Sequence, residues 1–337
     1  MVESELASPR QYLALTAGKW QTHLLAAAGE LQLGDILKDG PLSVEQVATR
    51  ATTDAAMTHR LLRALAALGI VVQQDDQRFA LTGLGQFLRS DIPPSMRALS
   101  MMGGRAWHDR CWEQLAQSVR SGTPGAELAF GAKLWDYFND HQGDFANFNE
   151  AMTAASAGMH FTAAQAYDFS RFKLIADIGG GFGRLMALLL ARTPGLRGIV
   201  FDRAQLADGC NAELRNCGVS DRCQFVAGDF FESVPEGADC HMMAHILHDW
   251  DDEQAVRILK TSRRSLAAGD TLLVLDAVIK GGPQDFGALM DLEIFLLFGG
   301  RDRTEPEFAK LFSEAGFQLT RVIPTQSTIS IIEGVAV

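Results

Sequence analysis

A glycine-rich run at positions 177–183 is the stretch of this sequence best suited to hold a ligand. It reads Asp-Ile-Gly-Gly-Gly-Phe-Gly and lies between two apolar segments, 174–176 and 185–190. That order is typical of a buried strand, a tight turn and an amphipathic helix, the first unit of a doubly wound α/β domain. Glycine lets the backbone turn sharply and approach a ligand where any Cβ would collide. The run therefore predicts a nucleotide-like cofactor over this turn, at the carboxyl end of the strand.

The spacing of these glycines narrows the kind of ligand. The dinucleotide fingerprint requires G-x-G-x-x-G, but the sixth position is Arg184 counted from Gly179 and Met186 counted from Gly181. No Lys-Ser or Lys-Thr pair follows, so the phosphate-binding P-loop pattern is missing as well. What remains is an acidic residue followed by G-x-G-x-G, a loop that suits a ligand without phosphate groups.

Further acidic residues lie where the next two strands of such a sheet would end. Asp202 closes the apolar segment 198–201, 23 residues after the first glycine. A carboxylate in that place can accept hydrogen bonds from both hydroxyls of a ribose. Asp229 and Phe230 follow the short apolar segment 225–227, where a carboxylate and an aromatic ring could hold adenine. Three strand ends at one edge favour a ligand site over three unrelated turns.

Composition is that of an ordinary globular protein long enough for two domains. The chain has 337 residues, of which 47% are hydrophobic and 21% charged. A net charge of −11 and a pI near 5.2 argue against nucleic acid, which requires a basic face. No apolar run approaches the ~20 residues of a membrane span, and the acidic first residues do not resemble a signal peptide. Five cysteines without a C-x-x-C pair indicate reduced thiols in a cytoplasmic protein and no metal site: Cys111, Cys210, Cys217, Cys223 and Cys240.

The N-terminal residues 1–97 show the pattern of a winged helix, in which a helix-turn-helix is followed by two short strands. Helical spacing of apolar residues covers 11–37, 42–48 and 55–68, and strands are expected at 70–72 and 78–81. The helix at 55–68 is crowded with leucines and carries only His59, Arg60 and Arg63 as possible cations. We therefore expect this domain to serve dimerisation and not DNA binding.

The rest of the chain divides into a helical segment at 98–170 and an α/β domain at 171–337. The helical segment is rich in aromatic residues and methionines, and the turn at 121–125 breaks it. Such a segment between two domains is a natural place for an apolar substrate pocket. From 171 onward strands and helices alternate, and a terminal hairpin adds one antiparallel strand to the parallel sheet.

The segment 244–253 resembles the L-H-D-W-D-D-E signature of S-adenosylmethionine-dependent O-methyltransferases that act on plant phenolics, acetylserotonin and bacterial aromatic metabolites. It reads Ala-His-Ile-Leu-His-Asp-Trp-Asp-Asp-Glu, and the likeness extends to 177–183, 228–231 and 299–304 in this order. The resemblance covers nearly the whole chain. It implies a Rossmann-like methyltransferase domain, a winged-helix dimerisation domain and a homodimer. It also implies S-adenosylmethionine as cofactor, S-adenosylhomocysteine as product, and no metal.

The resemblance also implies the catalytic residues. His248 would remove the proton from the substrate hydroxyl, a task that suits imidazole because its pKa lies near cellular pH. Two carboxylates would orient its ring, Asp276 after the segment 271–275 and Asp302 in the Arg-Asp-Arg segment. Plant relatives have glutamate at both places, so each of these side chains is one methylene shorter here.

Cofactor and substrate residues follow from the same resemblance, position by position. The cofactor would contact Gly179, Gly181, Asp202, Asp229, Phe230, Ser156 and His245. Plant relatives carry lysine where this chain has Ala244, so one cationic contact to the cofactor is missing. A flat aromatic acceptor such as a phenol, a hydroxyquinone or an N-hydroxy heteroaromatic would be lined by Trp107, His108, Met152, Ile294 and Phe298.

Other functions remain open at this point. A C- or N-methyltransferase fits the same motifs, because an in-line methyl transfer can proceed without a strong base. A hydroxylase of the same fold that keeps S-adenosylmethionine is disfavoured, because such relatives tend to lack the histidine of His-Asp-Trp. A ligand-responsive winged-helix regulator is disfavoured by the net charge of −11. A nicotinamide dehydrogenase is disfavoured because the third glycine of the G-x-G-x-x-G fingerprint is missing.

Overall fold

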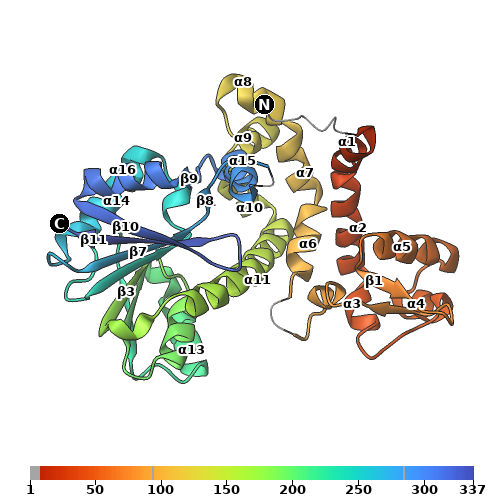
Figure 1. Ribbon diagram of the computed structural model, residues 1–337, viewed down its shortest axis with the longest axis horizontal. Coiled ribbons are helices and arrows are strands. Elements are labelled where there is room, and N and C mark those ends of the chain that lie inside the picture. The colour runs from red at the N-terminus through yellow and green to blue at the C-terminus, as the bar shows by residue number, and fades with distance from the viewer. Residues whose placement is uncertain (1–7, 93–94, 284) are drawn as a thin grey trace, which may run out of the picture. The chain divides into compact units, whose positions relative to one another are not determined.

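The computed structural model describes residues 8–92, 95–283 and 285–337 (Figure 1). The chain folds as two compact units. The first comprises residues up to Glu113 together with Trp135–Ser156, and the second comprises Gln114–Leu134 and Ala157–Val337. Within the described part of the chain, no helix has the length and apolar character needed to cross a bilayer.

The second unit is built on a seven-stranded sheet with the order β10-β11-β7-β6-β3-β4-β5. Strand β11 runs antiparallel to both of its neighbours, and β3 to β7 pair in parallel. The predicted mixed sheet with one antiparallel strand is therefore confirmed. Its strands are β3 Leu174–Ile178, β4 Arg197–Asp202, β5 Cys223–Ala227, β6 Cys240–Ala244, β7 Thr271–Asp276, β10 Phe317–Pro324 and β11 Ser330–Ala336.

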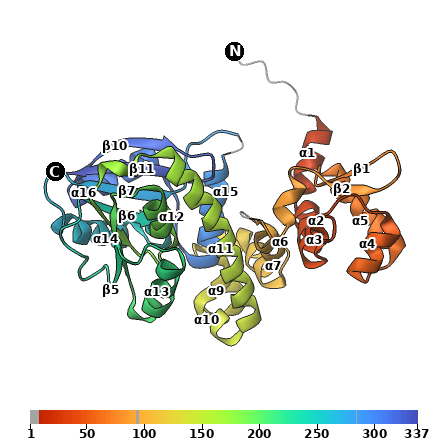
Figure 2. The ribbon, with the colours of Figure 1, turned by 90° about the horizontal axis from the view of Figure 1, so that it is seen from below.

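Helices cover both faces of this sheet (Figures 1 and 2). Alternate residues of each strand enter two separate cores, as Ile175 and Ala176 of β3 illustrate. Ile175 packs with α11 (Gln142–Ala166), α12 and α13 on one face, whereas Ala176 packs with α14 and α16 on the other. The helices of this unit are α8 Leu115–Ser121, α9 Gly125–Phe130, α12 Arg184–Arg192, α13 Ala207–Asn216, α14 Asp252–Arg264, α15 Phe286–Phe298 and α16 Glu305–Ala315.

A short parallel pair, β8 Val278–Ile279 with β9 Arg303–Thr304, lies outside the main sheet. Strand β8 follows β7 directly, and β9 follows the Gly-Gly-Arg-Asp segment after α15. Pairing of these two strands brings the end of β7 beside residue 302. The fold thereby joins two acidic positions that are far apart in the sequence.

The first unit contains the predicted helix-turn-helix and hairpin. Asp54 caps α5 through a bond from the Met57 N–H, and β1 pairs with β2 in antiparallel register. The segment 11–37 is helical, as its spacing predicts, and forms three helices; Gln32 adopts a left-handed conformation (φ 56°) and separates the second from the third. The elements are α1 Pro9–Thr16, α2 Gly18–Glu30, α3 Leu33–Ile36, α4 Val44–Ala51, α5 Ala55–Ala67, β1 Val71–Gln73, β2 Phe79–Leu81, α6 Arg97–Gly103, α7 Ala106–Glu113 and α10 Leu134–Asp140.

The segment expected to be helical at 98–170 is helical, and parts of it belong to each of the two units. The turn predicted at 121–125 is present, with Gly122 in the left-handed conformation that ends α8. The long helix α11 Gln142–Ala166 contributes its first part to the first unit and its last part to the second.

Candidate active site

The glycine run forms a tight turn between β3 and α12, as the sequence predicts. Gly179, Gly181 and Gly183 all have positive φ, at 77°, 57° and 75°. A Cβ on Gly179 would lie 2.4 Å from Cδ1 of Ile246, so a side chain cannot be accommodated there. A Cβ on Gly181 would meet nothing within 4 Å. The turn is thus tightly packed at Gly179 and open at Gly181. The open side leaves room for a ligand to approach the backbone.

Asp202 ends β4 and is held against this turn. Its Oδ2 accepts a hydrogen bond from the Gly181 N–H at 2.8 Å, and its Oδ1 accepts one from the Arg203 N–H at 2.7 Å. Beneath the turn, Asp177 is buried and its Oδ1 has no hydrogen-bond partner among the described residues. Burial, reinforced by the charge of Asp202, raises the pKa of Asp177 to about 7. The carboxyl groups of Asp177 and Asp202 therefore lie at the turn, and each can accept further hydrogen bonds.

Asp229 and Phe230 follow β5, beside the same turn. The Oδ1 of Asp229 accepts a bond from the Phe231 N–H at 2.8 Å, which fixes the backbone at this corner. A Cβ on Gly179 would lie 3.8 Å from the ring of Phe230, so this ring borders the glycine turn. The ring also packs edge-on against Trp250, with 6.1 Å between centroids.

His248 lies on a short 3₁₀ turn, η4 Leu247–Asp249, that follows the end of β6. Its Nδ1 is 3.7 Å from Oδ1 of Asp276 and 3.6 Å from Oδ1 of Asp302. Both carboxylates are buried, and both distances lie just beyond hydrogen-bond length. The pairing that the resemblance implies is therefore present, although the shorter aspartates leave a small gap. On the other side of the ring, Nε2 is 3.6 Å from Oδ1 of the half-exposed Asp249.

These charges set the protonation of His248. Burial by itself lowers the pKa of His248, but the neighbouring carboxylates of Asp276, Asp302 and Asp249 outweigh it and raise this pKa to about 9. Burial raises the pKa of Asp276 to about 7, against the opposing effect of the His248 charge. The free protein thus holds His248 largely protonated at neutral pH.

The raised pKa predicts the pH dependence of turnover. If neutral His248 is the base, kcat/KM should rise about tenfold per pH unit below pH 9 and level off near it. Asp302→Asn removes one carboxylate from the Nδ1 side, so it should lower the pKa of His248 and move the rising limb to lower pH. The measurement is kcat/KM from pH 6 to 10 in the presence of a chelator. A flat wild-type profile, or a shift to higher pH in the variant, contradicts the assignment.

A buried arginine, which the sequence reasoning did not single out, fixes the turn that carries His248. The Arg303 guanidinium is fully buried, donates to the Leu247 and Trp250 carbonyls at 2.8 Å each, and pairs with Asp252 at 2.9 Å. The neighbouring Arg301 N–H donates to the His248 carbonyl at 2.8 Å. A Cβ on Gly300 would lie 2.1 Å from that same carbonyl oxygen, so this close approach requires glycine. Residues of the Gly-Gly-x-x-Arg-Thr motif thus hold η4 in place through hydrogen bonds and close packing.

His245 lies next to the base in an unusual backbone conformation. Its φ of 58° is in the left-handed region, which non-glycine residues adopt at some cost. Its ring centroid is 5.7 Å from that of His248 and 5.8 Å from that of His160 on α11. Burial lowers the pKa of His245 well below its usual range and that of His160 to about 4. Both imidazoles are therefore neutral. Neither His160 nor Asp249 was foreseen as part of the site, although Asp249 belongs to the signature itself.

The predicted substrate residues are divided between the two units. Trp107, His108 and Met152 belong to the first unit, as does the cofactor candidate Ser156. Trp107 is buried and packs edge-on against Phe138 with centroids 5.3 Å apart, which gives it a core role within that unit. Ile294 and Phe298 lie on α15 in the second unit, and a Cβ on Gly300 would be 2.9 Å from the Cγ2 of Ile294.

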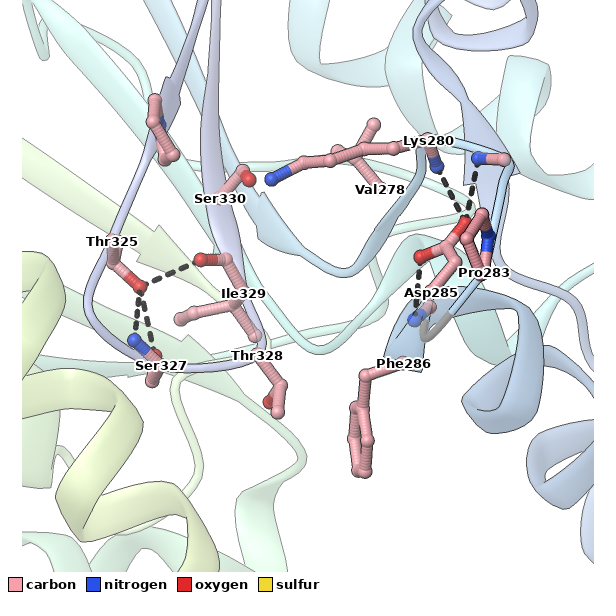
Figure 3. Close-up of a pocket in the computed structure, with 13 residues that line it drawn as sticks. Val278, Lys280, Pro283, Asp285, Phe286, Thr325, Ser327, Thr328, Ile329 and Ser330 are labelled. Carbon is pink, nitrogen blue, oxygen red and sulfur yellow. Dashed lines mark hydrogen bonds between the residues drawn. The ribbon is translucent and has the colours of Figure 1, made fainter. Parts of the chain in front are cut away.

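A cavity of about 290 Å³ lies elsewhere in the second unit, between the loop before α15 and the β10–β11 hairpin (Figure 3). None of the predicted site residues lines it. Asp285 accepts hydrogen bonds from the N–H groups of Lys280, Gly281 and Gly287, and Thr325 ties the hairpin through Ser327 and Ile329. These bonds fix the two loops that form the walls of the cavity.

The site thus combines a glycine turn, an adjacent strand-end carboxylate and a histidine flanked by buried carboxylates on an α/β sheet. Residues 112–318 match the O-methyltransferase domain family, and residues 13–91 match the O-methyltransferase dimerisation domain. The chain belongs to the O-methyltransferase family. It is an S-adenosylmethionine-dependent enzyme, and the reaction of this family needs no metal.

Individual relatives agree with this assignment. The chain is 36% identical to a phenazine O-methyltransferase of Lysobacter antibioticus over 95% of this chain and 94% of the relative. It is similar to the crystal structure of a calicheamicin-biosynthesis methyltransferase with S-adenosylhomocysteine bound, with a TM-score of 0.90, 35% identity, and coverage of 99% and 100% of the two chains. It is also 31% identical to an 8-amino-8-demethylriboflavin N,N-dimethyltransferase of Streptomyces davaonensis, over 92% of this chain and 90% of the relative. Relatives therefore include enzymes that methylate nitrogen.

Proposed function

We propose that this protein methylates a hydroxyl group of a small aromatic natural product, with His248 as the general base. The observation that carries the proposal is the placement of His248 beside two buried carboxylates, at the same sheet edge as the glycine turn. Asp276 and Asp302 orient the ring through Nδ1 and favour its protonated form. This leaves Nε2 as the nitrogen that takes the hydroxyl proton as the oxygen becomes nucleophilic.

The residues around the glycine turn fit S-adenosylmethionine. The open space above Gly181, the Asp202 carboxylate and the unpartnered Oδ1 of Asp177 suit a ligand rich in hydroxyl and ammonium donors. S-adenosylmethionine supplies an electrophilic methyl group when bound. We assign its binding to Gly179, Gly181 and Asp202, with Asp229 and Phe230 toward the adenine, and with Ser156 and His245 as further contacts.

We further propose that the acceptor is a flat aromatic molecule contacted by Trp107, His108, Met152, Ile294 and Phe298. The proposed domains are a winged-helix dimerisation domain at 1–97, a helical pocket segment at 98–170 and the methyltransferase domain at 171–337. Exposed apolar side chains on α1 and α2, including Tyr12, Leu15 and Trp20, support a homodimer formed through the N-terminal domain. Five free thiols agree with a cytoplasmic location.

The test of the proposal is calorimetric titration of the purified protein with S-adenosylmethionine and, separately, with NADH. We expect micromolar binding of S-adenosylmethionine alone. Phenolic acceptors, each paired with the matching aromatic amine, are then screened for methylated product by mass. Methylation of the amines only, unaffected by loss of His248, would favour the N-methyl chemistry of the riboflavin-analogue relative. Absence of S-adenosylmethionine binding would contradict the proposal.

The role of Asp202 can be tested separately from the chemistry. Asp202→Ala removes the acceptor at the turn, so S-adenosylmethionine affinity should fall about 10–100-fold, as expected for lost hydrogen bonds to a charged group. At saturating cofactor, kcat should change much less. The exposed Asp221 provides a matched control, because Asp221→Ala should leave the dissociation constant unchanged. Equal affinities for wild type and Asp202→Ala, measured by calorimetry, would place the ribose elsewhere.

A further inference from the structure

The groups around His248 also have the donor set of a transition-metal site. We propose that two histidines and two aspartates, here called the His-Asp cluster, bind a divalent ion such as Zn²⁺ and that this ion inhibits methyl transfer. The members of the cluster are His245, His248, Asp276 and Asp302. Ion binding does not depend on the identity of the reaction, whereas the inhibition rests on the proposed function.

Three members of the His-Asp cluster, His245, His248 and Asp276, lie within reach of a common ion, and the fourth, Asp302, lies beside His248. One ligand atom each of His245, His248 and Asp276 lie within 4.8 Å of one another. Nδ1 of His248 is 3.7 Å from the Asp276 oxygen and 3.6 Å from the Asp302 oxygen. Zinc bonds of about 2.0–2.1 Å place neighbouring ligand atoms of a tetrahedron about 3.4 Å apart. Small side-chain movements therefore suffice to close the site around an ion.

The cluster also contains buried donor atoms that nothing in the described chain satisfies. Both carboxylate oxygens of Asp276, both of Asp302 and the Nε2 of His245 are buried without a hydrogen-bond partner among the described residues. Buried polar atoms without partners are costly, and such groups in a native structure require an explanation. An ion at the centre of the cluster would satisfy an atom of each residue at once.

A divalent ion would balance the charge of both aspartates in their ionised form. When both aspartates are ionised they carry two negative charges, and a proton on His248 offsets only one of them. The nearest buried cation, Arg303, directs its guanidinium to the carbonyls of Leu247 and Trp250 and to Asp252. A divalent ion with two neutral imidazoles and two carboxylates gives a site of zero net charge.

The backbone at His245 is a further observation in favour of the site. Its left-handed φ of 58° is a strained state that persists only where the surrounding structure enforces it, and such states gather at functional sites. Imidazole nitrogen and carboxylate oxygen together suit zinc and its neighbours in the first transition row.

The inhibition follows from the tautomer of His248. A neutral imidazole has one N–H and one lone pair, and an ion on Nδ1 occupies the lone pair. The single proton must then reside on Nε2, the nitrogen that has to accept the substrate proton. Binding of the ion releases the proton of Nδ1 to solvent and leaves a ring that cannot act as a base.

Direct binding of Co²⁺ and Zn²⁺ to the full-length, untagged protein tests the proposal in the absence of substrate and cofactor. We expect one equivalent of Co²⁺ to bind with the intense visible absorption of a tetrahedral site. Asp302→Asn and His245→Gln, both close in size to the native residues, should each weaken Zn²⁺ binding about 10–100-fold. The control is Cys217→Ser, which removes the exposed cysteine and should leave binding unchanged.

X-ray absorption of the Zn²⁺-loaded wild type provides a result that needs no variant. Nitrogen and oxygen neighbours without sulfur would support the His-Asp cluster. A sulfur neighbour, loss of binding in Cys217→Ser, no saturable binding, or unchanged binding in both cluster variants would overturn it. Binding of Zn²⁺ without binding of S-adenosylmethionine would contradict the proposed function and support the metal site. If methyl transfer is insensitive to Zn²⁺ at concentrations that fill the site, the inhibition is wrong.

Discussion

Replacement of His248 by alanine should reduce kcat by about 10²–10⁴-fold while the affinity for S-adenosylmethionine stays nearly unchanged. The reason is that His248 contacts Asp276, Asp302 and Asp249, whereas the glycine turn is held by Asp202 on a different strand. The loss should therefore appear in the chemical step and not in cofactor binding. The measurements are single-turnover rates at saturating cofactor and a calorimetric dissociation constant.

The His248→Ala prediction has a matched control variant and results that would contradict it. His141 is an exposed histidine on the first unit, and His141→Ala should have wild-type kcat. Loss of cofactor affinity together with activity in His248→Ala would show that the histidine supports the fold of the site. Retention of full activity would favour a methyl transfer that needs no base, as on an amine.

The second large effect is expected at Arg303, which never touches the reacting atoms in our assignment. Arg303→Met keeps the length of the side chain but removes its bonds to the Leu247 and Trp250 carbonyls and to Asp252. Loss of these three charged hydrogen bonds in a buried position should lower the free energy of unfolding by about 3 kcal/mol or more. Displacement of η4 should lower kcat about 100-fold, because catalysis is sensitive to shifts of about 1 Å.

Arg301 is the matched control for Arg303. It pairs with the same Asp252 at 3.3 Å, but its side chain is 41% exposed, so the pair is a surface ion pair of small value. Arg301→Met should change the unfolding free energy by less than about 1 kcal/mol. Denaturant unfolding, with kcat measured well below the melting temperature, separates stability from positioning. If Arg303→Met is folded at that temperature and has wild-type kcat, the positioning role is wrong.

Sequence patterns determined much of this protein by local physics. The run of apolar residues, glycines and apolar residues at 174–190 specifies a strand, a turn and a helix through side-chain periodicity and backbone freedom alone. The single antiparallel strand followed from the terminal hairpin. The family assignment followed from three motifs, at 177–183, 244–253 and 299–304, that occur in this order along the chain. Helical spacing at 11–37 correctly indicated helices, but it does not report the left-handed residue Gln32 that separates the second helix from the third.

Only the tertiary structure decided how the catalytic groups meet. Asp276 and Asp302 are 26 residues apart in the sequence, and they approach His248 because β8 and β9 pair beyond the main sheet. No sequence pattern reports the neighbouring carboxylates that raise the pKa of His248 to about 9, nor the close packing of Gly300 against the His248 carbonyl. The gathering of His245 and His248 with Asp276 is likewise a property of the folded chain. Electrostatics and packing depend on distances through space, and spacing along the chain does not encode them.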